Sequence, residues 1–336
     1  MNKSFRTELA TEKSAIEIEY QSSVMMLGSC FSDHIGSLLQ KNKFSVHLNP
    51  FGVLYNPASI AQLLFLVLRN GQINLSGLTH FNNQWHSLLL HGSFSDSNAD
   101  VLIRQANKAI RNTREVLANT NILFITFGTS WVYQWKASNE IVANCHKIPA
   151  SQFHRFRLTL EEIVTEWTLL IEHLKNFNPA LKIIFTVSPV RHLKDGLHEN
   201  QLSKATLLLA IDQLIKQDQT NKLAYFPSYE MVQDDLRDYR FYAEDMLHIS
   251  DQAVHYIYEK FQNVFFSQQT VQTSKDIHSI VQLKEHRLLS KNPIEIVKFA
   301  ELALKKIDLF KEKYPHVKFE LEKNYFENII QTNRLL

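Results

Sequence analysis

The stretch V-M-M-L-G-S-C-F-S-D-H-I-G-S-L-L, residues 24–39, decides the fold. Its first four residues are apolar and precede Gly28-Ser29, which is typical of a short buried strand that ends in a tight turn. The next apolar residues recur at helical spacing: Phe31, Ile35, Leu38 and Leu39. A strand that enters a helix through Gly-Ser presents a side chain and backbone N–H groups at the carboxyl edge of a parallel sheet. Ser29 is therefore a candidate nucleophile, with the simple N-cap of a helix as the alternative.

The composition is that of an ordinary globular protein and excludes several functions. The chain has 336 residues, is 45% hydrophobic and 21% charged, and carries a formal net charge of +2. This balance gives no electrostatic case for binding nucleic acid or an anionic membrane. No apolar run reaches the ~18–20 residues that a membrane-spanning helix needs. Two cysteines, Cys30 and Cys145, are too few for a disulfide framework, so we expect a reducing, cytoplasmic location.

Strand and helix patterns alternate between residues 24 and 266, which predicts an α/β fold with a parallel sheet and helices on both faces. The expected strands lie at 16–20, 24–27, 44–49, 121–127, 182–188 and 223–226. The expected helices lie at 57–70, 98–119, 159–177 and 199–217, with a further one starting after Ser250. Residues 132–135 and 141–143 predict a hairpin, and residues 72–97 a long loop or small hairpin excursion.

The last part of the chain follows a different pattern. The polar run at 267–275 indicates a linker, and the mixed-charge segment from about 276 is predicted to be helical. We therefore expect a catalytic domain at 1–268 and a helical extension at 269–336. One helix, which starts at Pro293, carries an apolar stripe: Ile296, Val297, Ala300, Ala303, Leu304 and Ile307. We expect this stripe to pack on the chain's own domain; closing over the pocket or joining a second subunit as a homodimer are the alternatives.

Small polar residues follow three of the expected strands, at one edge of the sheet: Gly28-Ser29, Gly128-Thr129-Ser130 and Ser188-Pro189. Late in the chain, Asp245 and His248 are three residues apart, close enough to pair within one turn. An aspartate can hold the tautomer of a histidine that deprotonates a serine, although a plain surface turn has the same spacing. Cys30 is an alternative nucleophile, and a buried structural thiol is its more ordinary role.

The remaining polar residues indicate a substrate pocket better than a metal site. Four histidines could gather around a metal: His86, His146, His192 and His248. No two of them have the helical i,i+4 spacing of metal ligands, so no metal or cofactor is expected. The residues predicted to bind substrate are these: Asn56, Trp85, His86, Asn144, His146, Arg191 and His192. Arg191 would suit a carboxylate or a phosphate, or would pair with an acidic neighbour.

Several of these motifs together resemble a known family. G-S-C-F-S at 28–32 is similar to the motif that names the GSCFA family of the SGNH/GDSL hydrolase superfamily. Further blocks are similar in the same order: N-P-F-G (49–52), T-F-G-T-S-W-V-Y (126–133), N-C-H-K (144–147), S-P-V-R-H (188–192) and E-D-M-L-H (244–248). The resemblance covers roughly residues 20–266. It implies a flavodoxin-like three-layer α/β fold, with the helical extension outside it.

Position by position, the resemblance implies that Ser29 is the nucleophile, His248 the general base and Asp245 its orienting carboxylate. It implies hydrolysis or transfer of an acyl ester, with acetyl as the expected acyl group and a small molecule or carbohydrate as the substrate. The alternative is a non-catalytic carbohydrate-binding or scaffold protein that retains the fold.

The resemblance also implies a set of oxyanion donors. They would be the backbone N–H groups of Ser29 or Cys30 and of Gly52, together with the block at Gly128 and Ser130. The sequence departs from the superfamily in two places, because Ser130 stands where an asparagine is expected and the aspartate of Gly-Asp-Ser is missing. Asn56 or Asn144 could supply the missing amide.

Overall fold

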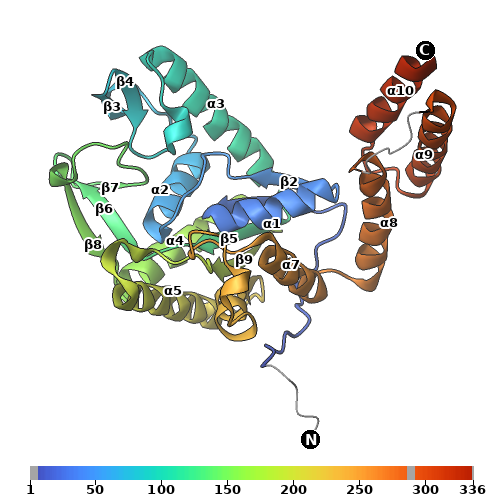
Figure 1. The fold of residues 1–336 in the computed structure, drawn as a ribbon. Coiled ribbons are helices and arrows are strands. Elements are labelled where there is room, and N and C mark those ends of the chain that lie inside the picture. Colours follow the sequence, from blue (N-terminus) through green and yellow to red (C-terminus); the bar gives the residue numbers. More distant parts are fainter. Residues whose placement is uncertain (1–6, 286–291, 335–336) are drawn as a thin grey trace, which may run out of the picture.

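The computed structural model describes residues 7–285 and 292–334. Its centre is a five-stranded parallel sheet with the strand order β10-β9-β5-β1-β2 (Figure 1). The strands are β1 (Ser23–Gly28), β2 (Ser45–Leu48), β5 (Ile122–Phe127), β9 (Lys182–Val187) and β10 (Leu223–Phe226). The predicted α/β fold with a parallel sheet is therefore confirmed.

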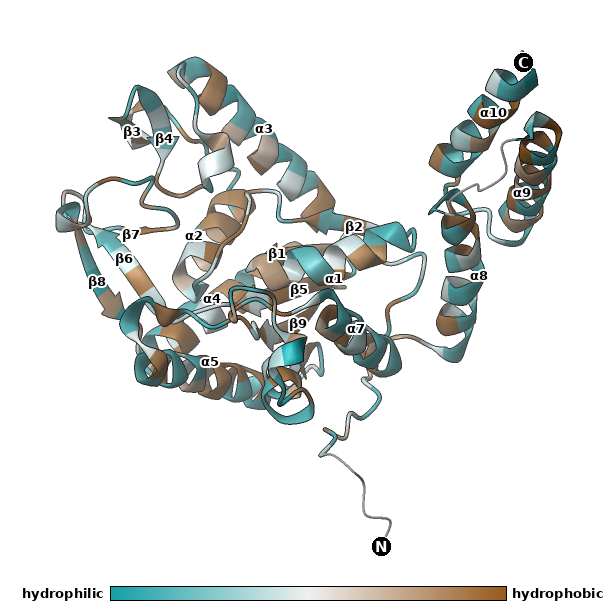
Figure 2. Cartoon of the chain, in the orientation of Figure 1, coloured by the Kyte–Doolittle hydropathy of each residue, from teal (hydrophilic) through white to brown (hydrophobic). Residues whose placement is uncertain are grey.

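Helices cover both faces of this sheet. Met25 and Leu27 of β1 point into an apolar core with four of the helices: α2 (Pro57–Leu68), α3 (Ala99–Ala118), α4 (Leu160–Phe177) and α5 (Leu197–Gln217). Val24 and Met26 point the other way, into a second core with α1 (Cys30–Lys41) and α7 (Asp251–Phe265). Strands buried on both faces are continuously apolar, and Figure 2 shows this hydrophobic colouring along β1.

Two small antiparallel sheets lie beside the central sheet. The excursion at 72–97 contains the hairpin of β3 (Leu78–Phe81) and β4 (Gln84–Ser87). The predicted hairpin after β5 is also present, as β6 (Trp131–Trp135) and β7 (Ile141–Val142). A strand that the sequence did not predict, β8 (Phe153–Arg157), pairs with the other edge of β6. These three strands form one wall of the cavity described below.

Two predicted elements were wrong. Residues 16–20 do alternate between buried and exposed side chains, but they form no strand. Their segment bonds instead to the end of α7, with Ser14 N–H donating to Val264 O at 2.9 Å and Ile18 N–H to Phe265 O at 2.8 Å. The expected linker at 267–275 is the start of α8 (Gln268–Glu285), because the Ser267 hydroxyl accepts the Thr270 N–H at 3.0 Å and caps the helix.

The C-terminal helices lie to one side of the sheet and its helices (Figure 1). α9 (Pro293–Lys313) packs against α10 (Glu320–Arg334), and both contact α8. Three residues of the predicted apolar stripe are buried: Ala300, Ala303 and Ile307. The expectation of helix at 286–291 lies outside the described residues. No helix in the described parts of the chain has the length and hydropathy needed to cross a membrane.

The C-terminal helices also contact the rest of the protein. Phe319 and Phe326 belong to the same buried apolar cluster as Tyr20 and Phe44. Lys43 Nζ lies 2.6 Å from Glu322 Oε1, and both side chains of this ion pair are largely buried. The tail therefore packs on its own chain through α8, the 314–319 segment and α10, whereas the helix that carries the predicted stripe, α9, packs mainly against α10 and α8.

Candidate active site

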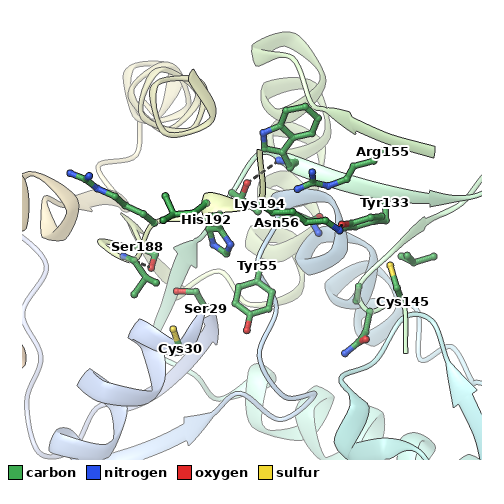
Figure 3. Close-up of a pocket in the computed structure, with 18 of the residues that line it drawn as sticks. Ser29, Cys30, Tyr55, Asn56, Tyr133, Cys145, Arg155, Ser188, His192 and Lys194 are labelled. Carbon is green, nitrogen blue, oxygen red and sulfur yellow. Dashed lines mark hydrogen bonds between the residues drawn. The ribbon is translucent and has the colours of Figure 1, made fainter. Parts of the chain in front are cut away.

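A cavity of about 610 Å³ opens at the carboxyl ends of β1, β5 and β9. Its walls come from the loops after these strands, from β6, β7 and β8, and from the loop before α7. The polar and aromatic residues that line it include Ser29, Cys30, Tyr55, Asn56, Thr129, Trp131, Tyr133, Asn144, Phe153, Arg155, Ser188, Arg191, His192, Lys194 and His248. In Figure 3, Ser29 and His192 lie together, and Tyr133, Arg155 and Lys194 lie beyond Tyr55.

Ser29 occupies the turn between β1 and α1. Gly28 has a φ of +137°, and a Cβ there would lie 2.2 Å from Thr126 O, so only glycine fits this turn. Ser29 caps α1, since its hydroxyl accepts the Phe31 N–H at 3.4 Å. The residue is 1% exposed and still lines the cavity. Ser29 therefore lines the cavity at a helix N-terminus, where the helix dipole stabilises developing negative charge.

The loop before α7 pairs the predicted histidine and aspartate. His248 Nδ1 lies 2.5 Å from Asp245 Oδ2, and Asp245 Oδ1 accepts the backbone N–H groups of Leu247 and His248, each at 2.9 Å. The hydrogen bond from His248 and these two backbone donors lower the pKa of Asp245 to about 2. His248 lines the cavity with Ser29, whereas Asp245 is not among the lining residues. Of the hydrogen bonds among described residues, none joins Ser29 to His248.

The predicted oxyanion donors separate into two groups. The Cys30 N–H lies at the start of α1 beside Ser29, and no oxygen in the described residues accepts it. Gly52 and Gly128 have their N–H groups occupied, by Asn49 O at 2.8 Å and by Tyr55 O at 2.7 Å respectively. Neither glycine is among the residues that line the cavity. Their backbone groups therefore shape the surrounding loops and do not face the cavity.

Ser130 is also turned away from the cavity. It is fully buried, and its N–H and hydroxyl both donate to Ser203 Oγ, at 2.8 and 3.1 Å. Asn56 lines the cavity in its place. Its Oδ1 caps α2 by accepting the Ser59 N–H at 2.8 Å, while no oxygen in the described residues accepts from its Nδ2. The cap fixes the Asn56 amide and leaves the NH₂ group able to donate.

Three predicted substrate residues lie outside the cavity, on or beside the 72–97 excursion: Trp85, His86 and His146. The rings of His86 and His146 stack with centroids 4.5 Å apart, and the Ser95 hydroxyl contacts both rings. Burial lowers the pKa of His146. The other predicted substrate residues, Asn144, Arg191 and His192, line the cavity with Asn56.

A lysine that the sequence did not single out lies beneath the cavity. Lys204 of α5 is 1% exposed, and its Nζ donates to Gly128 O at 2.6 Å and to Ser188 O at 2.7 Å. It thereby ties together the residues that follow β5 and β9. Burial lowers the pKa of Lys204 to about 7. From sequence alone, a lysine in the middle of a predicted helix is expected to face solvent. The sequence therefore does not predict that Lys204 is buried beneath the cavity.

Burial also affects two titratable groups that line the cavity with Ser29, His192 and Cys30. It lowers the pKa of His192 to about 4, with the charges of Lys204 and Arg155 acting in the same direction. It raises the pKa of the Cys30 thiol, to which the Asp33 carboxylate contributes. His192 is therefore neutral near pH 7 and Cys30 is a thiol there. Within the described residues, no three His, Cys, Asp or Glu side chains are grouped as metal ligands.

A search of curated proteins finds no match to the chain. Among solved structures, a carbohydrate esterase family 3 protein from Talaromyces cellulolyticus is 10% identical with a TM-score of 0.37, over 76% of this chain and 99% of that one. An acetyl esterase mutant with acetate ion is 10% identical with a TM-score of 0.36, over 76% and 100%. An acetyl xylan esterase from the rumen bacterium Butyrivibrio proteoclasticus is 10% identical with a TM-score of 0.36, over 73% and 63%. Likenesses this distant transfer neither residues nor activities.

Comparison of the sequence with models of protein families identifies its family. The model of the GSCFA family matches residues 23–261, from the first residue of β1 into the last turns of α7. That range contains Ser29, Asp245 and His248 and every residue that lines the cavity. The chain belongs to the GSCFA family.

Proposed function

We propose that this protein is an SGNH-type serine hydrolase that cleaves or transfers the acyl group of an ester through an acyl-enzyme on Ser29. The observation that carries the proposal is that Ser29, at the N-terminus of α1, and His248, held by Asp245, line one cavity. The rest of the chemistry follows from the contacts of these three residues.

In the first step, the Ser29 hydroxyl attacks the ester carbonyl carbon while His248 Nε2 takes its proton. Asp245 is bonded to Nδ1, which leaves Nε2 as the atom that accepts. Contacts between catalytic groups are often long without substrate, and we expect the Ser29–His248 contact to close when the ester binds.

The negative charge moves to the carbonyl oxygen as the new bond forms. Two donors on residues that line the cavity with Ser29 are available to stabilise it: the Cys30 N–H and the Asn56 Nδ2. Asn56 would then supply the amide that Ser130, bonded to Ser203, cannot. A single oxyanion donor contributes about 10²–10³ in rate where it has been measured.

The tetrahedral intermediate then collapses: the ester C–O bond breaks, the alcohol leaves with the proton from His248, and the acyl group remains on Ser29. His248 then deprotonates water, which releases an acid, or a second alcohol, which receives the acyl group. The choice of acetyl as the acyl group rests on analogy with the SGNH superfamily. Cys30 is a poor alternative nucleophile because burial raises its thiol pKa, and only the thiolate attacks well.

The direct test is labelling with a fluorophosphonate, which reports an activated serine without knowledge of the substrate. Wild-type protein should be labelled and Ser29→Ala should not. Ser188→Ala is the matched control, because Ser188 is a buried serine that lines the same cavity, and it should be labelled like wild type. A folded wild-type protein that resists labelling would contradict the proposal and favour a non-catalytic binding role.

A further inference from the structure

Positive charge gathers around the cavity. Three cationic side chains line it, Arg155, Arg191 and Lys194, and of the described residues that line it none is an aspartate or a glutamate. Tyr133, Arg155 and Lys194 form one group in Figure 3, beyond Tyr55 as seen from Ser29. A substrate that fills the cavity from Ser29 to this group meets cations at its far end.

Only one of these cations is balanced by a carboxylate. The Arg155 guanidinium is paired with Asp195 in a two-pronged ion pair. Lys194 donates to the neutral hydroxyl of Tyr133, and Arg191 to the neutral amide of Gln233 at 2.7 Å. Neither Lys194 nor Arg191 forms an ion pair with a described carboxylate. Two of the three cations that line the cavity are therefore available to pair with an anionic group of a ligand.

The aromatic residues at this end hold the cations in place. The Arg155 guanidinium lies 4.9 Å from the ring centroid of Trp131 and 5.1 Å from that of Tyr133. Lys194 Nζ lies 4.9 Å from the Tyr133 centroid. In a cation–π contact the ring quadrupole attracts the charged group and holds it over the ring face. With a guanidinium over both rings, this wall is better suited to an anion than to stacking on a neutral sugar.

The charge acts on groups inside the cavity. Lys194 and Arg155 both oppose the rise that burial causes in the pKa of the Cys145 thiol, which reaches about 11. Arg155 and Lys204 both help to lower the pKa of His192. Two titratable groups that line the cavity therefore experience a positive potential.

We propose that the ester substrate carries a carboxylate, which binds to the Lys194 ammonium and the Tyr133 hydroxyl while the ester carbonyl lies at Ser29. The inference rests on the proposed function, since it assigns a substrate class to the same cavity. A volume of about 610 Å³ accommodates an acyl group and an alcohol part of small-molecule size. Lys194 is a substrate-binding residue in this assignment and takes no part in proton transfer.

Two acetate esters of the same size test this assignment: 4-acetoxybenzoate, which is anionic, and its methyl ester, which is neutral. Their kcat/KM values are divided by their rates of alkaline hydrolysis to remove the intrinsic difference in reactivity. In the wild type, the corrected kcat/KM should be about fivefold higher for the anionic ester than for the neutral one, which is the difference expected from one partly exposed charge pair. Lys194→Gln should lose this preference, because glutamine carries no charge to pair with the carboxylate. The matched control is Lys136→Gln, because the exposed Lys136 follows β6 outside the cavity and should behave as wild type.

A second readout separates the inference from the proposed function. The product analogue 4-hydroxybenzoate should slow fluorophosphonate labelling of Ser29 in the wild type and not in Lys194→Gln. Labelling that occurs without any protection, or an anionic preference that survives in Lys194→Gln, would overturn the carboxylate site and leave the esterase intact. Absence of labelling in the wild type would overturn the proposed function, and the carboxylate site with it.

Discussion

His248 Nδ1 and Asp245 Oδ2 lie 2.5 Å apart in the loop before α7. The second carboxylate oxygen of Asp245 accepts two backbone N–H groups of the same loop. These bonds hold the carboxylate in position, and the carboxylate in turn holds the His248 ring. The imidazole is thereby held with a hydrogen on Nδ1 and a lone pair on Nε2. This is the tautomer that a general base needs.

Asp245→Asn should lower kcat/KM on p-nitrophenyl acetate by at least about a hundredfold, because an amide can present its NH₂ group to Nδ1 and so favour the wrong tautomer. The melting temperature should change little, since both side chains are half exposed. Asp234→Asn is the control, as it removes an exposed carboxylate paired with Arg237 outside the cavity. Equal losses of activity in the two variants would assign Asp245 a structural role only.

The pH dependence should distinguish the two histidines of the cavity. Only a neutral imidazole can accept the Ser29 proton, so the rate should rise with pH in the range 5–8, where histidines change charge. His192 should not contribute to that rise, because burial lowers its pKa to about 4. Asp245, with a pKa of about 2, stays ionised throughout. We expect the rise to persist in His192→Gln and no measurable turnover in His248→Gln; a profile that flattens in His192→Gln would make His192 the base.

The central sheet could be predicted because its signal is local. Strands such as 122–127 are buried on both faces, so a continuous apolar run between turn residues has one ready interpretation. Ser29 followed from the same logic, since the Gly28 turn after β1 places the next residue at the sheet edge. The pairing of Asp245 with His248 was predictable because three residues span a single turn.

The rest depends on contacts between distant segments. β8 carries His154, Arg155 and Arg157 among its apolar residues, and it becomes a strand only by pairing with β6. The alternation at 16–20 is as regular as that of a strand, yet the segment bonds to the end of α7. Lys204 has partners 76 and 16 residues away along the chain. The hydrophobic periodicity of a segment predicts its local structure and cannot predict contacts with residues this far away along the chain.

Lys204 should leave a mark on the pH dependence of stability. Its pKa is about 7 in the folded protein and 10.5 in an unperturbed lysine, so between these values the unfolded chain binds a proton that the folded protein lacks. The free energy of unfolding therefore gains a contribution that increases as pH rises from about 7 to 10. Urea unfolding of Lys204→Met at pH 6.5 and 9.5 should lack this increment. Lys216→Met, at an exposed lysine, should retain it; an unchanged increment in Lys204→Met would mean that Lys204 remains charged in the folded protein.

The domain division near residue 268 leads to the last prediction. Removal of residues 269–336 should lower the melting temperature, because it uncovers Tyr20, which is 8% exposed and packs against the ring of His316, and deprives Lys43 of Glu322. Substitutions within the tail provide the control. Ile307→Ser, at a fully buried position, should weaken the tail, whereas Leu302→Ser, at a side chain 58% exposed, should not.

Labelling of the truncated protein then decides whether the tail serves the active site. None of the described residues of α8, α9 and α10 lines the cavity, and the Asp245–His248 pair lies before α7. The truncated protein should therefore react with a fluorophosphonate at Ser29 as wild type does, although it unfolds at a lower temperature. A truncated protein that keeps its stability but cannot be labelled would reverse both expectations. The C-terminal helices would then be part of the catalytic unit, and residues 1–268 would not be a domain of their own.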